Sequence, residues 1–263
     1  MSRYERWNTL LDLVAVHGHL DVTEAAQALG VSEATIRRDL DKLAEQRMLT
    51  RTRGGAVTSS QLAYDLPLLY KTARNAPEKL HIGRAAAALV TPGSTVALNG
   101  GTTTLEVARA LVNRGEPQDG QAGSGITVVT NALSIAGELA SRPQIKLVVT
   151  GGVARTGSHE LIGPLATYVL DDLTFDWVIL GVDGLDTVAG ATAHNEGEAS
   201  INRLMTQRAQ HVAIVADSSK LGKRAFARVC GLDKIEAVVT DATLESPAAG
   251  AFADKGVRVI TAT

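Results

Sequence analysis

The feature that most constrains the fold is a series of short apolar runs that recurs from residue 95 to the end of the chain. Each run is rich in Val, Ile, Leu and Ala without regular polar alternation, which is typical of strands buried on both faces of a sheet. The runs are Thr95–Leu98, Ile126–Val129, Ile145–Val149, Trp177–Leu180, Val212–Val215, Ala237–Val239 and Val257–Ile260. Helical stretches at 103–112, 132–141, 160–173 and 198–209 lie between them, so the sequence predicts an α/β domain with a mostly parallel sheet.

A second constraint comes from residues 31–43, whose pattern predicts an amphipathic helix. Ser32 can cap the start of this helix, and apolar residues at helical spacing form one stripe along it. The stripe consists of Ile36, Leu40 and Leu43. Upstream, Thr23 is expected to cap a shorter helix that ends at Gly30. Two short helices joined by a tight glycine-containing turn are typical of a helix-turn-helix, whose second helix enters the major groove of DNA.

Basic residues lie on the polar side of this helix and directly after it. Residues 47–57 contain Arg but no acid, and they read as two short strands about a Gly54–Gly55 turn, which predicts a wing beside the helix-turn-helix. A net charge of −2 argues against a protein that coats nucleic acid, but it allows binding through a local patch. The predicted DNA-binding residues are Ser32, Thr35, Arg37, Arg38, Lys42, Arg51 and Arg53.

Small and polar residues follow the apolar runs, and we expect them to form a binding site where the carboxyl ends of the parallel strands meet. The turn Gly100–Thr104 leads into a helix, so its N–H groups and hydroxyls suit a phosphate or carboxylate, although a plain glycine turn with a threonine cap would look the same. Together with Lys220 and nearby Asp and Asn residues, this pattern favours a phosphorylated polyol. The predicted effector-binding residues are Asn99, Gly100, Gly101, Thr102, Thr103, Thr104, Thr130, Asn131, Gly152, Arg155, Asp183, Asn195, Glu196 and Lys220. His159 and Glu160 are further candidates for this site, but a surface loop is the favoured interpretation for them.

The run TIRRDL at Thr35–Leu40, followed by Leu49, Arg51 and Gly54–Ala56, resembles the DNA-binding domain of the DeoR family of bacterial sugar-metabolism repressors. Arg47 stands where that family commonly has Gly, and Arg53 stands where it commonly has His. Both departures add positive charge to the predicted wing, and a residue other than Gly at position 47 suggests strain or a different exit from the helix.

The resemblance continues into the rest of the chain and covers nearly all of it. Pro92-Gly93, the Gly101–Thr104 turn, Asp183-Gly184 and Asp217–Lys220 are similar to motifs of the family's sensor domain, whereas Asn99 replaces an Asp often found there. The resemblance implies a domain related in fold to ribose-5-phosphate isomerase that binds sugar-phosphate inducers.

A length of 263 residues suits two domains. We expect a winged helix-turn-helix domain at 1–57, a connector at 58–75 and an effector-sensing domain at 76–263, with a surface loop at 115–125. The lone Cys230 cannot form an internal disulfide, and the His residues lack metal-ligand spacing, so neither a metal site nor a cofactor is expected. With no leader-like start and no apolar run of about 18 residues, we expect a cytoplasmic protein without membrane contact.

The leading hypothesis is a DNA-binding transcriptional regulator, a repressor of carbohydrate-metabolism genes whose operator binding responds to a phosphorylated sugar. One recognition helix reads too few base pairs for genomic selectivity, so a homodimer or homotetramer on double-stranded operator DNA is expected. The rival is an isomerase-like enzyme that carries a DNA-binding module, because Asp183, Asp186, Glu160 and Lys220 could transfer protons. A constitutive architectural DNA binder is a third alternative, which the large second domain disfavours.

Overall fold

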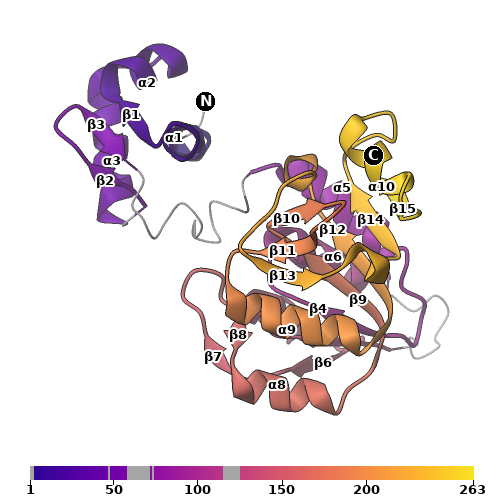
Figure 1. Ribbon diagram of the computed structural model, residues 1–263. Helices are drawn as coiled ribbons and strands as arrows, with labels where there is room; N and C mark the ends of the chain where they lie inside the picture. Colours follow the sequence, from indigo (N-terminus) through magenta and orange to yellow (C-terminus); the bar gives the residue numbers. More distant parts are fainter. Residues whose placement is uncertain (1–2, 47, 58–71, 73, 115–124) are drawn as a thin grey trace. The chain divides into compact units, whose positions relative to one another are not determined.

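The computed structural model describes residues 3–46, 48–57, 72, 74–114 and 125–263. The chain divides into two units, Met1–Arg74 and Asn75–Thr263, whose elements are labelled in Figure 1. Arg47, most of the expected connector 58–75 and nearly all of the expected loop 115–125 lie outside the described residues, so those expectations stay predictions.

Residues 3–57 of the first unit, apart from Arg47, form helices and a small antiparallel sheet with strand order β1-β3-β2. Its elements are α1 (Arg3–His17), β1 (His19–Asp21), α2 (Val22–Leu29), α3 (Glu33–Glu45), β2 (Thr50–Arg51) and β3 (Gly55–Val57). The helices and strands share one core. The predicted apolar stripe of α3 is confirmed, because the side chains of Ile36, Leu40 and Leu43 have no exposed surface.

The turn between α2 and α3 follows the prediction, but the cap of α2 does not. Gly30 ends α2 with φ 63° and ψ 35°, a left-handed conformation that glycine adopts without strain. Ser32 caps α3, since its Oγ accepts the Thr35 N–H at 3.2 Å. The cap of α2 is Asp21 rather than Thr23, because Val22 is already helical; Asp21 Oδ1 accepts the Thr23 N–H at 2.7 Å.

The wing differs from the expected Gly-Gly turn. The turn between β2 and β3 consists of residues 52–54, and Gly55 is the first residue of β3. A Cβ atom on Gly55 would lie 1.7 Å from the carbonyl oxygen of Leu20, so only glycine permits this pairing with β1. The sequence did not predict β1, because its three residues His19–Asp21 are too few to show a period.

Seven parallel strands form the main sheet of the second unit, which confirms the predicted parallel α/β architecture. They are β4 (Thr95–Leu98), β5 (Ile126–Thr130), β6 (Ile145–Val149), β9 (Phe175–Gly181), β12 (Ala209–Val215), β14 (Ala237–Thr240) and β15 (Arg258–Thr261). Their order is β15-β14-β12-β9-β4-β5-β6. The chain therefore builds outward from β4 through β5 and β6, then returns to place β9 on the other side of β4.

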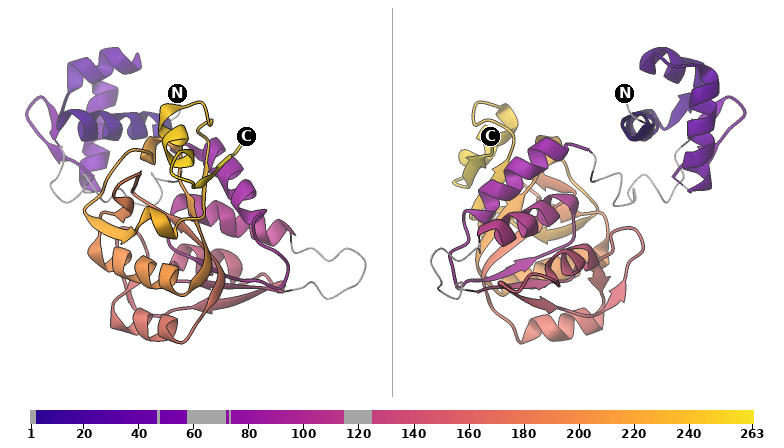
Figure 2. Two further views of the ribbon diagram at one scale, coloured as in Figure 1. Left: turned by 45° about the vertical axis from the view of Figure 1, so that its right-hand side comes forward. Right: turned by 180° about the vertical axis from the view of Figure 1, so that it is seen from behind.

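Helices cover both faces of this sheet. One core contains residues of α5 (Ala76–Ala87), α6 (Thr102–Arg114) and α7 (Leu133–Leu139), and the other contains residues of α8 (Pro164–Asp171), α9 (Glu196–Gln207) and α10 (Pro247–Ala253). Figure 1 shows α8 and α9 on the near side of the sheet, and the view from behind in Figure 2 shows α5 and α6 on the opposite side. None of the described helices is long and apolar enough to cross a membrane.

Several short strands were not predicted from the sequence. β10 (Gly184–Asp186), β11 (Gly190–Ala193) and β13 (Ala227–Cys230) form an antiparallel sheet, and β7 (Val153–Ala154) pairs with β8 (Leu161–Ile162). Two 3-10 turns, Ser218–Lys220 and Leu232–Lys234, follow β12 and β13. These strands have two to four residues and many small side chains, so they lack the apolar pattern on which the prediction depended.

The helix predicted at 160–173 was wrong at its start. Pro164 is the first residue of α8, where a missing N–H costs nothing, and Gly163 precedes it with φ 90°. Leu161 and Ile162 are extended instead, and Glu160 pairs with Ala132 in an antiparallel bridge. Glu160 is therefore buried beside the end of β5, with 4% of its surface exposed, and does not lie in a surface loop.

Candidate functional site

The polar side of α3 carries the predicted DNA-binding residues of the first unit. Arg37 pairs with Glu33 at 3.0 Å, and Lys42 pairs with Glu45 at 2.8 Å; both basic side chains are about 60% exposed. Such surface ion pairs contribute little to stability, so these two side chains can exchange their partners for phosphates. In the part of the chain that the structure describes, the exposed Arg38 has no hydrogen-bond or ion-pair partner.

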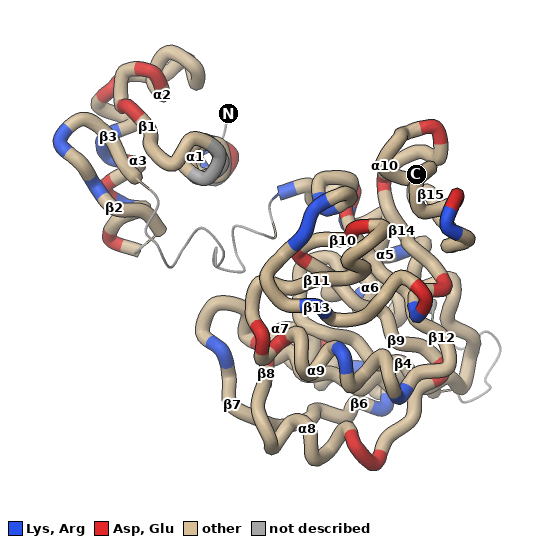
Figure 3. The backbone as a smooth tube through the Cα atoms, in the orientation of Figure 1, with Lys and Arg blue, Asp and Glu red and all other residues tan. Residues whose placement is uncertain are grey.

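The two arginines of the wing have different surroundings. Arg51 donates to Asp41 Oδ1 at 2.8 Å and to the Gly55 carbonyl, so it ties β2 and β3 to α3. Arg53 is exposed in the β2–β3 turn and has no partner within the described residues. Figure 3 shows Lys and Arg in blue on α3 and at this turn. Arg38 and Arg53 are thus the most available cations of the predicted set.

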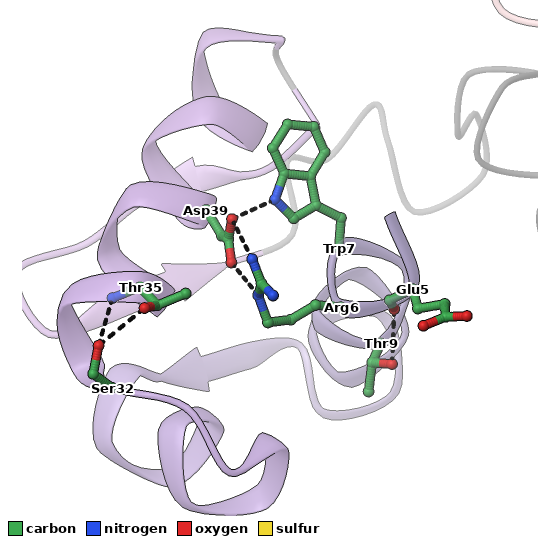
Figure 4. Close-up of polar contacts among 7 residues, drawn as sticks. All are labelled: Glu5, Arg6, Trp7, Thr9, Ser32, Thr35 and Asp39. Atoms are coloured by element: carbon green, nitrogen blue, oxygen red, sulfur yellow. Dashed lines mark hydrogen bonds and ion pairs between the residues drawn. The ribbon is translucent and has the colours of Figure 1, made fainter. Parts of the chain in front are cut away.

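Asp39 is a buried acid on the inner side of α3 that the sequence analysis missed. Its carboxylate accepts from Trp7 Nε1 at 2.6 Å and from both Nε and Nη2 of Arg6 (Figure 4). Both partners belong to α1, and 5% of Asp39 is exposed. These bonds hold α3 in one rotation against α1, with Arg38 outward. The available signal was an acid at helical spacing from Ile36 and Leu43 within the apolar stripe.

In the second unit, most of the predicted effector residues follow β4, β5, β9 and β12 at the carboxyl edge of the sheet, which we call the rim. Strand order reverses between β4 and β9, and open α/β sheets bind ligands at such a reversal. The rim begins with the turn Gly100–Thr103, which opens α6, and continues with Gly181–Asp183 after β9.

Several rim residues are bonded to the protein's own backbone. The Asn99 amide joins β4 to β9, because Nδ2 donates to the Gly181 carbonyl at 3.0 Å and Oδ1 accepts the Gly181 N–H at 2.9 Å. Thr104 and Thr130 have no exposed surface, and their hydroxyls donate to the carbonyls of Gly101 and Leu98. Asn99, Thr104 and Thr130 therefore hold the strand ends and the turn in place.

The outer predicted residues surround the start of α9. Asp183 accepts the His194 N–H at 2.9 Å, and Asn195 caps α9 by accepting the Glu198 N–H at 3.1 Å. Arg155, in the segment between β7 and β8, donates to Glu198 Oε1 at 2.9 Å. Two further predicted residues lie nearby. Glu196 is exposed at the first turn of α9, whereas Gly152, with φ 124°, packs against β8.

Glu160 lies at the centre of the rim, beside the Gly100 turn. Asn131 Nδ2 donates to Glu160 Oε2 at 3.0 Å, and the Gly100 N–H donates to the same carboxyl group. Burial, and next the negative charge of Glu198, raise the pKa of Glu160 to about 8 against these two hydrogen bonds. The Glu160 carboxyl is therefore protonated near neutral pH. The signal that could have placed it is Leu161-Ile162, a β-forming pair just before Gly163-Pro164.

A second buried acid, Asp217, follows the end of β12. Asp217 is buried, yet the hydrogen bond from Ser219 and the positive charges of Lys220 and Lys79 outweigh that burial and lower its pKa. Lys79 belongs to α5 and is itself buried, with 6% exposed. Asp217 thus joins the rim residue Lys220 to the first helix of the second unit. Within the described ranges, no cluster of three or more His, Cys, Asp or Glu side chains could hold a metal ion.

In comparison with known proteins, two family models match this chain. Residues 6–61 match the DeoR-like helix-turn-helix domain, and residues 74–242 match the DeoR C-terminal sensor domain. The HTH-type transcriptional regulator GlpR of Haloferax volcanii is 35% identical over 97% of this chain and 96% of its own. The glycerol-3-phosphate regulon repressor of Escherichia coli is 31% identical over 92% of each chain.

Among solved structures, ribose 5-phosphate isomerase A of Methanocaldococcus jannaschii overlaps 56% of this chain and 54% of its own, with 18% identity and a TM-score of 0.41. That overlap is too low to bear on the fold or activity of this chain. The two domain matches and the full-length relatives show that the chain belongs to the DeoR family of transcriptional regulators.

Proposed function

We propose that this chain is a repressor that binds double-stranded operator DNA through α3 and the wing, and that a phosphorylated sugar at the rim modulates this binding. One combination carries the proposal. This DeoR-family chain has an arginine on its recognition helix and another in its wing turn that lack partners among the described residues, and it has a polar rim where strand order reverses. Because one such helix reads few base pairs, the active species is a homodimer or homotetramer.

For the DNA contacts, we assign Arg38 to base edges and Arg53 to phosphates. Arg38 projects from the solvent side of the recognition helix, and Arg53 occupies the wing turn. Ser32, Thr35, Arg37 and Lys42 remain proposed contacts along the same helix. Arg51 is the weakest of the predicted set, because Asp41 and the Gly55 carbonyl already engage its guanidinium.

For the effector, we assign the phosphate to the N–H groups and hydroxyls of residues 100–103 and to Lys220. Backbone N–H groups at the start of a helix favour an anion, and α6 begins at Thr102. Asp183, Asn195, Arg155 and Glu196 would read sugar hydroxyls. This revises the expected set, since Asn99, Thr104 and Thr130 shape the rim and do not contact the ligand. The name of one relative, the glycerol-3-phosphate regulon repressor, supports this ligand class.

We further assign α5 to transmission of the effector signal. It is the first helix after the expected connector, and it lies against two segments that carry rim residues. Lys79 lies beside Asp217, and Gly83 packs so closely on α6 that a Cβ atom would be 2.6 Å from the Glu106 backbone. A shift at Lys220 or at the start of α6 would therefore displace α5. Regulation requires only that the effector prefer one of two arrangements.

Catalysis of sugar-phosphate isomerisation is the second candidate, because a carboxyl with a pKa of about 8 beside Asp183 could act as a general acid or base. The family relationship favours the regulator, and we propose that the chain has no turnover. Incubation with pentose and hexose phosphates, followed by product analysis, separates the two candidates. Any isomerised product above that of a heat-treated control would favour the enzyme.

The proposed function is tested in two steps with the full-length protein. First, a duplex is selected from a random library, and its affinity is compared with that of a scrambled duplex. Second, thermal unfolding is followed with a panel of sugar phosphates, including glycerol 3-phosphate, and with the unphosphorylated sugars. We expect a preferred duplex and a stabilising phosphorylated compound, since a ligand of the native state raises its stability by mass action. The absence of a preferred duplex would contradict the proposed operator binding. The absence of a stabilising phosphorylated compound would contradict the proposed effector site.

Replacing Lys220 by Met is expected to weaken effector binding by about tenfold while DNA binding stays unchanged, because Met keeps the aliphatic length and removes one charge near the phosphate. The exposed Lys223 provides a matched control as Lys223→Met. Affinities for the stabilising compound and for the selected duplex are measured separately. Equal losses of effector affinity in the two variants would mean that Lys220 contributes only to the overall electrostatic potential of the protein.

A further inference from the structure

The side chain of Glu160 covers the first residue of the proposed phosphate turn. A Cβ atom built on Gly100 would lie 2.2 Å from Glu160 Cγ and 2.7 Å from Glu160 Oε1. The Gly100 N–H, which an incoming anion would use, already donates to this carboxyl. The protein's own acid thus occupies one donor of the turn, as an oxyanion ligand would.

The backbone around Glu160 fixes it at this place. The Leu161 N–H donates to the Asn131 carbonyl at 2.7 Å, and the Arg155 N–H donates to the Glu160 carbonyl at 2.8 Å. The main chain on both sides of Glu160 is therefore anchored, and only its side chain can leave the turn without rearranging β8.

The carboxyl itself is weakly held. The charged groups around it are Glu198 on α9, Asp183 after β9, and Arg155, whose guanidinium donates to Glu198. The neutral donors of Asn131 and Gly100 hold the Glu160 carboxyl, and bonds between neutral groups are weaker than charge-assisted ones. Asn131 Oδ1 is buried and lacks a donor within the described residues, so the protein's own groups do not fully satisfy this junction.

We propose that Glu160 is a gate of the effector site: its carboxyl occupies the Gly100 N–H in the free protein, and the phosphate of the effector binds this turn by displacing it. The inference rests on the proposed function, because it concerns the same rim. The gate makes the site selective for ligands that bind the turn more strongly than a carboxyl, which favours phosphate dianions over sugars that lack a phosphate.

Displacement couples effector binding to a proton. The buried carboxyl, with a pKa of about 8, carries a proton near neutral pH, whereas a displaced side chain in water returns toward the ordinary value of 4.5 and ionises. Binding between these values releases that proton to solvent. The affinity for phosphate compounds is therefore expected to rise with pH up to about 8 and then to level.

Two substitutions of Glu160 separate the effect of occupying the Gly100 N–H from the effect of the proton on the carboxyl. Glu160→Ala opens the turn, and Glu160→Gln keeps a side chain of the same shape that cannot ionise. The probes are inorganic phosphate and glycerol 3-phosphate, titrated calorimetrically near neutral pH in two buffers of different ionisation enthalpy. Thermal unfolding checks that each variant is folded. Ionisation of the probe itself is common to all three proteins, so the variants serve as its control.

We expect Glu160→Ala to bind the probes about tenfold more tightly than the wild type, because the ligand no longer breaks hydrogen bonds to gain the turn. We expect Glu160→Gln to lose the proton release of the wild type. Equal or weaker binding by Glu160→Ala, or wild-type proton release by Glu160→Gln, would overturn the gate while leaving the effector site intact. If Glu160→Ala does not fold, the proton release of Glu160→Gln decides. Absence of binding by all three proteins would contradict the site itself.

Discussion

Replacing Asp39 by Ala is expected to destabilise the DNA-binding unit by about 3–5 kcal/mol and to abolish sequence-specific DNA binding. The substitution leaves the Arg6 guanidinium, whose side chain is 14% exposed, and the Trp7 Nε1–H without their shared acceptor. An uncompensated buried charge costs more than the ion pair contributed. The fixed rotation of α3 against α1 is also lost, and with it the outward direction of Arg38.

Chemical denaturation of the full chain, followed by Trp7 fluorescence, measures this effect, with Trp177 in the second unit providing a separate signal in a Trp7→Phe variant. The matched control is Asp41→Ala, two residues further along the helix. The Asp41 side chain is 58% exposed and pairs with Arg51, so a change of about 0–1 kcal/mol is expected. A loss of unfolding free energy in Asp39→Ala as small as that in Asp41→Ala would show that Asp39 is an ordinary surface acid of α3.

Replacing Arg38 by Ala is expected to weaken binding to the selected duplex by about 1–3 kcal/mol and to leave binding to a scrambled duplex much less affected. The reason is that the Arg38 guanidinium, which has no partner in the described part of the chain, can form two hydrogen bonds to a guanine edge that a phosphate contact does not replace. Fluorescence anisotropy with the two duplexes, each over a range of salt concentrations, gives both affinities.

The matched comparison is Arg53→Ala, which removes the wing arginine that also lacks a partner among the described residues. If Arg53 contacts phosphate, binding to both duplexes falls equally, and the slope of log affinity against log salt decreases by about one. An equal loss on both duplexes for Arg38→Ala would assign Arg38 to the backbone as well. Sequence reading would then fall to Thr35, Arg37 or Lys42.

The sequence predicts the main elements well where a long-range pattern is repeated. Each of the apolar runs is a strand of the parallel sheet, because strands buried on two faces must be apolar throughout. The recognition helix follows from its stripe and from the Ser32 cap. Such features depend on local chemistry that any fold of this class must satisfy.

The positions of Asp39 and Glu160 could not be predicted in the same way, because a tertiary contact determines each of them. Asp39 is buried only because α1 supplies Arg6 and Trp7, which lie over thirty residues away in the sequence. Glu160 is buried because the end of β5 accepts residues 160–162 as an extended neighbour. An acid is usually exposed, but partners distant in sequence bury both of these side chains.

Glu160 also changes what the rim implies about the effector. A turn of glycine and threonine suggested an open anion site, but its first donor is occupied by a protonated carboxyl in the free protein. If Glu160 is the proposed gate, effector binding exchanges one ligand of the turn for another. This exchange provides a local event, next to α6 and α5, from which a change in DNA affinity can start.

Thermodynamic coupling between DNA and effector tests most directly whether the effector regulates DNA binding. The affinity of the full-length protein for its selected duplex is measured with and without a saturating concentration of the phosphorylated compound that stabilises it, and the affinity for that compound is measured with and without duplex. We expect both affinities to change by the same factor, about 5–150-fold, and the unphosphorylated sugar to have no effect. A compound that binds the rim at saturation yet leaves duplex affinity unchanged would contradict regulation by the effector.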